Sequence, residues 1–543
     1  MRLVKVLSDG TPDNKHYILF GDSDSESATG ENVFPNAGVT LVYDEEKTWI
    51  RDSDTENLRS YSVNFVTSTV ITNKGWSYDA DTKTLTLSGD EVAWYEFADY
   101  ASMVENVEFA NDFNVETMPA SAFYGFSEVT EIEIPDCVKY IGNRVFSNCV
   151  SLSSVDFPEG LQNVGDEAFM NCECLAKVSL LAGLQSIGNS AFYNCISIIS
   201  VDFPEGLQSV GDRAFCGCEY LTSASFLDGL ESIGDSAFYG CSSIASVDFP
   251  AGLESIGDYA FYRCSSLSSV EFPEGLKSIG DDAFCGCDNL GSVKFPAGLE
   301  SIGVYVFGLC SSLHSVEFPE GLKSIGNYAF YDCDNLGSVK FPAGLESIGN
   351  YAFFSCDELT SVEFPEGLKS IGDDAFCVCD NLGSVEFPEG LESIGDYAFY
   401  LCSSYRFTSV TLPSTLNRIG DYAFSGCSSL ETVIMRSNGT SEEKHYILLG
   451  DTDKKTAIGE DVFPKRQATL VYDPNTTWIG NGAGQNLLYY FYGKTQETAL
   501  DVPSVISAPA QYYDLGGRRV SVESYRGVVV KVENGKSELM MVK

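Results

Sequence analysis

Histidine is almost absent from this sequence, which contains 3 in 543 residues, at His16, His314 and His445. A Ser-His-Asp triad, a Cys-His pair or a histidine-based metal site needs such a side chain beside particular partners. His16 and His445 occupy equivalent places in two copies of one segment, and His314 stands alone at a variable position of a repeat. The sequence therefore offers no catalytic residues of these kinds, and we expect each histidine to be a surface or packing residue.

Basic residues and long apolar runs are also scarce. The 33 Lys and Arg residues face 78 Asp and Glu residues, which gives a net charge of -45. Such an acidic surface repels nucleic acid and anionic lipid. No run of 18 apolar residues could span a membrane, and Met1 to Gly10 lack the apolar core of a signal peptide. These absences exclude nucleic-acid partners and membrane insertion.

What the sequence does contain is a tandem repeat. A phenylalanine marks each unit, and successive markers are 23 residues apart, except that an insertion around Ser404 to Arg406 stretches the last step to 25. The markers are Phe123, Phe146, Phe169, Phe192, Phe215, Phe238, Phe261, Phe284, Phe307, Phe330, Phe353, Phe376, Phe399 and Phe424. A fixed period of this length is typical of a solenoid, in which each unit forms one coil. We therefore predict a solenoid over residues 100–437.

One coil, residues 267–287, shows how the chain folds locally. Residues 270–272 alternate apolar and polar side chains, which predicts a short, half-buried strand. Pro-Glu-Gly at 273–275 turns the chain, and residues 276–279 form a second extended piece. Asp281 could then cap a single helical turn. A single coil buries too little apolar surface to fold alone, so stability must come from stacking on its neighbours.

Two rows of outward residues alternate in charge from coil to coil, and we interpret them as ion-pair ladders that support stacking. The first row is Glu271, Lys294, Glu317, Lys340 and Glu363. The second row is Glu254, Lys277, Glu300, Lys323, Glu346, Lys369 and Glu392.

The coil pattern Leu-x-x-Val-x-Phe-Pro-x-x-Leu-x-x-Ile-Gly-x-x-Ala-Phe-x-x-Cys, as in residues 267–287, resembles the BspA-type leucine-rich repeat. The resemblance covers residues 100–437. It implies a leucine-rich-repeat solenoid with short parallel β-strands, and a secreted or surface-anchored protein that adheres to host or bacterial molecules. The resemblance brings no family-wide binding residues with it.

The flanks of the array carry a second duplication, at a constant offset of 429 residues. Residues 11–50 recur within 438–497, for example as Lys-His-Tyr-Ile-Leu at 15–19 and again at 444–448. By this offset Met1 falls inside the last strand of an array. We therefore interpret 1–50 as the remnant of a preceding array, and expect a chain truncated at its N-terminus, with any signal peptide missing.

Small β-rich caps are expected at both ends of the array. Residues 51–99 include a predicted hairpin over Trp76–Ser88, which would cover the first coil. Residues 503–543 follow a Pro/Ala/Ser linker and resemble the C-terminal sorting domain of the type IX secretion pathway. That resemblance implies export to the cell surface; the alternative is a small β-module that completes the fold.

Thirteen of the 18 cysteines occupy one repeat position, from Cys149 to Cys427. Their Cβ vectors would run parallel in a ladder, so we expect reduced thiols that pack as small apolar residues rather than disulfides. The Cys-x-Cys pairs lie two or more coils apart, too far to share zinc. The pairs are Cys172 with Cys174, Cys216 with Cys218, Cys285 with Cys287, and Cys377 with Cys379.

Other patterns for cofactors are incomplete. Residues 22–26, Asp-Ser-Asp-Ser-Glu, lack the glycine and the later glutamate of a calcium loop, and their duplicate at 451–453 continues with lysines. Residues 480–484 are glycine-rich but lack a phosphate-loop lysine. We predict no metal and no cofactor.

Tyrosines form the most promising surface feature. One repeat position holds Tyr259, Tyr305, Tyr328, Tyr351, Tyr397 and Tyr422, and a second position three residues later holds Tyr239, Tyr262, Tyr331 and Tyr400. Coil by coil these side chains would form an amphipathic strip that could stack on sugars or anchor a protein. The alternative is that they only shield one side of the solenoid.

These patterns predict a non-enzymatic adhesin or ligand-binding scaffold, at the cell surface or secreted. Its ligand would be an extracellular protein or glycan, bound through an extended repeat surface. An enzyme would need a localised, non-repeating cluster of titratable residues, and none is evident. The alternative is a structural spacer or self-associating surface component without a specific ligand.

Overall fold

The computed structural model describes residues 70–439 continuously, and shorter segments on either side of them. These segments are 2–5, 16–20, 39–42, 48–52, 64–66, 443, 445–449, 462–464, 469–471, 477–480, 511–514, 527–533 and 536–542. The chain divides into two compact units, Met1–Cys241 and Ser242–Lys543.

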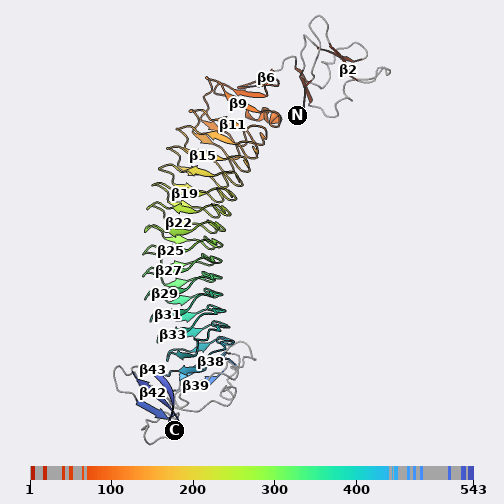
Figure 1. The fold of residues 1–543 in the computed structure, drawn as a ribbon. Helices are drawn as coiled ribbons and strands as arrows, with labels where there is room; N and C mark the ends of the chain where they lie inside the picture. The colour runs from red at the N-terminus through yellow and green to blue at the C-terminus, as the bar shows by residue number, and fades with distance from the viewer. Residues whose placement is uncertain are drawn as a thin grey trace. The chain divides into compact units, whose positions relative to one another are not determined.

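In unit 1 each coil contributes two short strands, and equivalent strands of successive coils pair in parallel (Figure 1). The first strands are β11 (Glu131–Glu133), β13 (Ser154–Asp156), β15 (Lys177–Ser179), β17 (Ser200–Asp202) and β19 (Ser223–Ser225). The second strands are β10 (Thr117–Met118), β12 (Tyr140–Ile141), β14 (Asn163–Val164), β16 (Ser186–Ile187), β18 (Ser209–Val210) and β20 (Ser232–Ile233).

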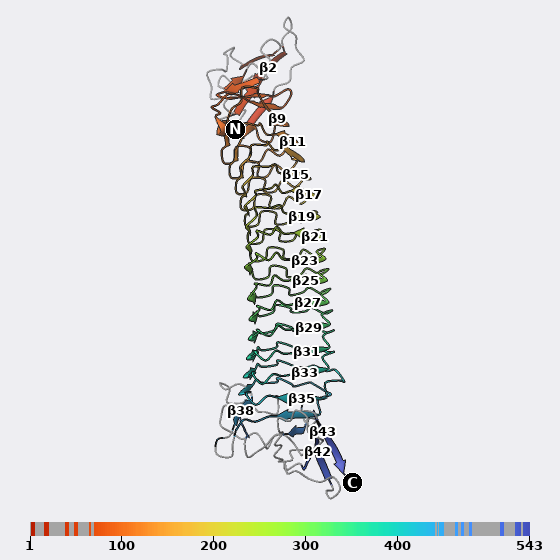
Figure 2. The same cartoon turned by 90° about the vertical axis from the view of Figure 1, so that its left-hand side faces the viewer.

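Unit 2 repeats the same arrangement (Figure 2). The first strands are β21 (Ser246–Asp248), β23 (Ser269–Glu271), β25 (Ser292–Lys294), β27 (Ser315–Glu317), β29 (Ser338–Lys340), β31 (Ser361–Glu363), β33 (Ser384–Glu386), β35 (Ser409–Leu412), β37 (Thr432–Met435) and β39 (Thr469–Val471). The second strands are β22 (Ser255–Ile256), β24 (Ser278–Ile279), β26 (Ser301–Ile302), β28 (Ser324–Ile325), β30 (Ser347–Ile348), β32 (Ser370–Ile371), β34 (Ser393–Ile394), β36 (Arg418–Ile419), β38 (His445–Leu449) and β40 (Thr477–Gly480).

The core of each unit is a stack of similar layers. The repeat phenylalanines are fully buried and stack ring on ring; the Phe330 and Phe353 centroids, for example, are 5.2 Å apart with ring planes 9° from parallel. In unit 2 this stack runs on beyond the 23-residue repeats, because Phe424 stacks on Phe463 at 5.5 Å. The predicted solenoid of 23-residue coils with short parallel strands is confirmed.

A single helical turn was expected between the second strand and the next coil, and the structure differs from this expectation. Tyr328 and Asp332 both have a φ of 58°, in the left-handed region, which interrupts a right-handed helix. The N–H groups of Tyr328, Phe330 and Asp332 donate instead to carbonyls of the next coil, each at 2.8 Å. The segment therefore consists of successive turns. Helix within the described residues is limited to two short 3-10 helices, η3 (Trp94–Glu96) and η4 (Ala98–Tyr100).

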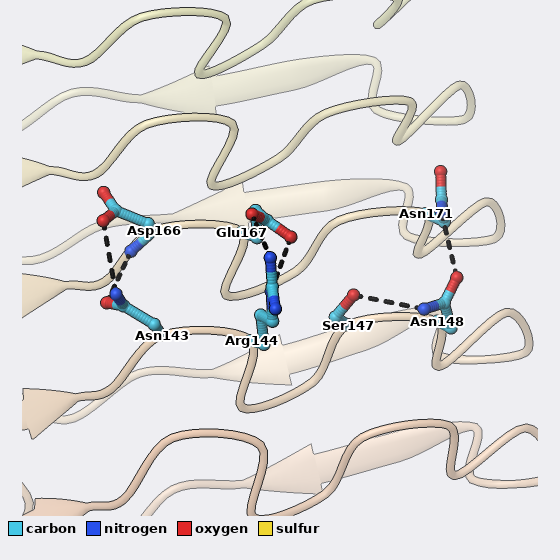
Figure 3. A network of polar contacts seen from close by, with 7 residues as sticks. All are labelled: Asn143, Arg144, Ser147, Asn148, Asp166, Glu167 and Asn171. Carbon is cyan, nitrogen blue, oxygen red and sulfur yellow. Dashed lines mark hydrogen bonds and ion pairs between the residues drawn. The ribbon is translucent and has the colours of Figure 1, made fainter.

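An asparagine or aspartate follows the second strand of most coils and joins it to the next coil (Figure 3). Asn143 Oδ1 accepts a hydrogen bond from the Asp166 N–H at 3.0 Å, and Asn143 Nδ2 donates to Asp166 Oδ2 at 3.2 Å. In unit 2 the expected helix cap Asp281 takes this role, because its Oδ1 accepts from the Val304 N–H at 2.7 Å. These side chains satisfy backbone donors between coils rather than at a helix end.

A small mixed sheet lies at the start of the array. The predicted hairpin is present: β7 (Trp76–Asp79) pairs antiparallel with β6 (Val70–Asn73) and β8 (Thr84–Leu87). β8 then pairs in parallel with β9 (Asn106–Phe109), and Trp94 lies edge-on to Phe123 of the first coil at 5.9 Å. The hairpin thus joins the first coil through the β8–β9 pairing, and Trp94 of η3 packs against Phe123 of that coil.

The duplicated flanking segments pair their strands in the same way. In unit 1, β2 (His16–Phe20) pairs with β4 (Thr48–Asp52), and β3 (Val39–Val42) pairs with β1 (Arg2–Lys5) and β5 (Asn64–Val66), all in parallel. In unit 2, β38 pairs with β40 in the register that the 429-residue offset requires, His445 opposite Thr477 as His16 is opposite Thr48. A three-stranded antiparallel sheet of β41 (Gln511–Asp514), β42 (Gly527–Glu533) and β43 (Lys536–Val542) follows.

Candidate binding surfaces

The alternating charge rows support the solenoid rather than form a separate site. The strand register places Glu271 opposite Lys294, and Lys294 opposite Glu317. Lysines of the second row pair with the preceding coil's glutamate, at 2.8 Å for both Lys323 with Glu300 and Lys369 with Glu346. More than half of each of these four side chains is exposed, so solvent screens each pair and it contributes little to stability.

The repeat cysteines form a buried ladder within each unit, from Cys149 to Cys241 in unit 1 and from Cys264 to Cys427 in unit 2. The thiol of Cys333 donates to the carbonyl oxygen of Phe307 in the preceding coil at 3.2 Å, and Cys356 bonds Phe330 in the same way at 3.3 Å. All 18 cysteines are free, and burial raises the pKa of ladder thiols such as Cys310 and Cys356 well above its usual value. As expected, these side chains pack as small core residues and satisfy a carbonyl group.

Of the histidines, acidic loops and glycine-rich segment singled out in the sequence, some lie in the described part of the chain and others lie outside it. His314 is exposed, whereas the side chains of His16 and His445 are outside the described part. The acidic loops at 22–26 and 451–453, and residues 481–484 of the glycine-rich segment, also lie outside it. Across the residues that are described, His, Cys, Asp and Glu side chains form no group of three or more suited to a metal ion. No helix in the same residues is long and apolar enough to cross a membrane.

We use the name tyrosine strip for the six residues at the first tyrosine position: Tyr259, Tyr305, Tyr328, Tyr351, Tyr397 and Tyr422. The structure brings three of them into one continuous stack. Ring centroids are 4.4 Å apart for Tyr305 and Tyr328, and 4.6 Å for Tyr328 and Tyr351, with nearly parallel planes. Tyr397 and Tyr422 form a second stack at 4.8 Å.

Two aspartates interrupt the tyrosine strip, in coils where the tyrosine is replaced. Asp282 accepts a hydrogen bond from Tyr259 and Asp374 accepts one from Tyr351, and burial raises the pKa of both carboxyl groups. The hydrogen bond to Asp374, with burial, raises the pKa of Tyr351 to about 12. These phenols therefore remain protonated donors across the physiological pH range.

The second tyrosine position widens the central stack. Tyr331 lies 5.9 Å from Tyr305 and 5.8 Å from Tyr328, and stacks on Phe354 at 5.0 Å. All of these rings are half-buried. At the other members of this position, Tyr262 lies edge-on to Tyr259 at 5.8 Å, and Tyr400 edge-on to Tyr397 at 5.4 Å.

This stacking limits what the tyrosine strip can bind. An aromatic ring recognises a sugar or a cation through its face. Within the stack both faces of Tyr328 are covered, by Tyr305 on one side and Tyr351 on the other. A partner would therefore meet ring edges and phenol hydroxyls, so the expected sugar stacking is restricted to the rings at the ends of each stack.

A polar groove of about 490 Å³, which the sequence analysis missed, lies on the second-strand side of unit 2. Its lining residues are Ile325, Asn327, Ser347, Ile348, Gly349, Asn350, Ser370, Ile371, Gly372, Asp373, Ser393, Gly395 and Arg418. Asn327 and Asn350 directly precede Tyr328 and Tyr351, so the groove adjoins the tyrosine strip along the chain. The sequence feature that could have indicated this groove is the repeated Ser-Ile-Gly-Asn/Asp motif, in which Arg418 replaces the serine of one coil in the groove.

Similar proteins were found among solved structures. A leucine rich cell surface protein of Faecalibacterium prausnitzii is 22% identical, with 75% of this chain and 96% of that chain covered and a TM-score of 0.39. A leucine-rich repeat protein of Bacteroides ovatus is also 22% identical, covering 72% and 90%, with a TM-score of 0.43. The pneumococcal vaccine antigen PcpA is 18% identical, covering 75% and 94%, with a TM-score of 0.36.

No curated protein matches the chain. The family model for the BspA type leucine rich repeat region matches at 91–222, 185–313, 231–359 and 346–447. These matches overlap and together span residues 91–447, well over half of the 543 residues. The chain therefore belongs to the family of proteins with BspA type leucine-rich repeats.

Proposed function

We propose that this protein is a non-enzymatic binding scaffold of the cell surface, an adhesin that contacts an extracellular protein or glycan through its tyrosine strip. The observation that carries the proposal is the central stack of Tyr305, Tyr328 and Tyr351. Its rings order one another, with centroids 4.4 and 4.6 Å apart. Binding to side chains that are already immobilised loses less conformational entropy than binding to free ones. Tyrosine is also among the residues that dominate protein interfaces.

The geometry favours a protein over a stacked sugar at the centre of the tyrosine strip. The central rings present edges and hydroxyl groups, which can pack against apolar side chains and donate to backbone carbonyls. A sugar could still stack on Tyr259, which lies outside both stacks and is 42% exposed.

Surface display is the setting that this proposal needs. The described sheet of β41, β42 and β43 falls within residues 503–543, the segment that resembles a type IX sorting domain. We propose that this module directs export, while the 51–99 cap protects the first coil of the 100–437 array. The segments 1–50 and 438–497 would be equivalent flanking coils, in line with their matching strand registers.

The test is capture of ligands on the immobilised full chain from matrix proteins, mucins and bacterial surface glycans. In the triple variant, Tyr305, Tyr328 and Tyr351 are replaced by alanine. A ligand that binds the wild type saturably should bind this variant at least about tenfold more weakly, because a hot-spot side chain contributes roughly 2 kcal/mol or more to binding. Replacing the same three with phenylalanine keeps the stack and removes only the hydroxyls. Full binding by that variant would assign recognition to ring packing, and lost binding to the hydroxyls.

The alternative is a spacer or self-associating surface component. It predicts that the folded chain retains no ligand and that its mass rises with concentration in sedimentation. Retention of a ligand that ignores the tyrosine changes would keep the scaffold role but reject the tyrosine strip as its contact surface.

A further inference from the structure

The polar groove presents a repeating set of hydrogen-bonding groups. Ser347, Ser370 and Ser393 add one hydroxyl each from three successive coils, and Asn327, Asn350 and Asp373 line the same groove. The Oδ1 atoms of these three side chains are committed, because each accepts from the N–H of the next coil at 2.8 Å. The Nδ2 donors of the two asparagines, the second oxygen of Asp373 and the hydroxyls of Ser347 and Ser370 belong to the same lining residues.

Arg418 stands in the groove at the position that serine holds in the preceding coils, opposite Ser393. Its Nη2 atom is 3.6 Å from Asp396 Oδ1, whereas its buried Nε–H has no acceptor in the described part of the chain. Of the Arg418 side chain, 40% is exposed, so its guanidinium can meet an acceptor of a ligand at this end of the groove.

The charges around the groove decide what kind of acceptor fits. Arg418 already has Asp396 beside it, and Asp373 lines the groove nearby. The whole chain carries a net charge of -45. An anionic ligand would be repelled by this surface. Neutral hydroxyl groups, which both donate and accept, match the mixture of amide donors, serine hydroxyls and carboxylate oxygen.

The length of the groove points to a polymer. Its lining residues come from five successive coils, from Ile325 to Arg418, and the parallel strands β28, β30, β32, β34 and β36 repeat the same groups at each step. Parallel strands lie about 4.8 Å apart, so equivalent groups recur along the groove at that spacing. An extended chain of similar sugar units can meet such a row with one unit after another.

We propose that this groove binds an extended, uncharged polysaccharide chain lying across the coils, with sugar hydroxyls bonded to the serine and asparagine side chains and one sugar oxygen to the exposed part of the Arg418 guanidinium. The inference goes beyond the proposed contact through the tyrosine strip and uses different residues. A protein ligand on the strip and a glycan in the groove could be bound by the same molecule.

The test uses the full chain and fluorescently labelled oligomers of neutral glucose and mannose polymers, with a uronic acid oligomer as the charged probe. We expect saturable binding of a neutral oligomer. In the double variant Ser347→Gln and Ser370→Gln, longer side chains fill the groove, and binding should weaken by about tenfold or more. Ser301→Gln changes the same repeat position in a coil that does not line the groove, and should bind like wild type.

Arg418→Gln gives an independent measurement, because it removes the guanidinium and should weaken binding without changing the strand pairs. Wild-type melting temperatures in all variants would show that they fold. The proposal is overturned if no neutral oligomer binds, if the uronic acid oligomer binds better, or if the groove-filling variant binds as well as Ser301→Gln does. Protein capture by the tyrosine strip should survive the groove variants, so failure of one site is distinguishable from failure of the other.

Discussion

At the level of single residues, the stability of the array depends on positions where the stacking of coils allows only one type of residue. The glycine after the second strand is such a position. A Cβ atom on Gly349 would lie 2.6 Å from the carbonyl carbon of Gly326 in the preceding coil. Because the contacted atom belongs to the backbone, it cannot move aside without separating the coils.

Gly349→Ala should therefore lower the free energy of unfolding by about 1–3 kcal/mol or more, the range of overpacking in a tight interior. Gly298→Ala is the matched control, because a Cβ there meets no atom within 4 Å. Urea unfolding of both variants measures the difference. Equal stabilities would mean that coils can separate freely at this position.

Asp357 is a residue that weakens the array at neutral pH. Burial, followed by the charges of Asp334 and Asp380, raises the pKa of its carboxyl group above the usual value of 3.8, and its Oδ1 has no partner in the described residues. A raised pKa in the folded state means that folding favours the protonated form. The penalty is therefore fully present above the folded pKa and disappears as the pH falls toward 3.8.

Asp357→Asn should raise the melting temperature at pH 7, and its advantage over wild type should shrink as the pH is lowered toward 4. Glu167→Gln should act in the opposite direction at pH 7, because the hydrogen bond from Arg144 lowers the pKa of Glu167. Thermal melts over this pH range measure both. If the advantage of Asp357→Asn instead grew on acidification, the effect assigned to burial of this carboxyl group would be wrong.

At the level of the repeated element, the cysteine ladder is a buried layer of the core. The ladder thiols donate to carbonyl groups, and burial raises their pKa, so little reactive thiolate forms. Cys174 is the exposed member of the 18 free cysteines.

Labelling of the native chain with a maleimide should modify Cys174 first and leave the thirteen ladder thiols protected until the chain unfolds. Peptide mapping by mass spectrometry identifies the modified sites. Rapid native labelling of Cys333 or Cys356 would indicate that coils open frequently.

The charge rows contribute little to the free energy of unfolding. Lys323→Glu would place a third glutamate in line with Glu300 and Glu346 and should lower stability slightly, and less at high salt than at low salt. Denaturant unfolding at two salt concentrations tests this. A larger, salt-independent loss would mean that the aliphatic stem of Lys323 contributes mainly through packing.

Much of the structure of each coil could be predicted from the sequence, because a 23-residue period with recurring Phe and Cys positions is compatible with only one way of stacking the coils. The turn segment could not, since most of its left-handed positions hold residues other than glycine, as at Tyr328 and Ser355. The tyrosine strip was predictable as a row, but the face-to-face contact that restricts its chemistry depends on side-chain rotation. The groove arises only when serine, glycine and asparagine positions of several coils are stacked.

At the level of the entire chain, different rows of side chains serve support and recognition. Phenylalanine, cysteine and aspartate or asparagine rows hold successive coils together within each unit. The tyrosine strip and the polar groove leave hydrogen-bonding groups toward solvent, so they are the surfaces on which a partner could act.

The most direct test of the binding role is the isotherm of the first ligand captured by the full chain, measured on wild type and on the variant with Tyr305, Tyr328 and Tyr351 replaced by alanine. We predict saturable binding that weakens by about tenfold or more in a variant that still melts cooperatively. Unchanged affinity in that folded variant would contradict the tyrosine strip as the contact surface, and the absence of any saturable ligand would contradict the binding scaffold itself.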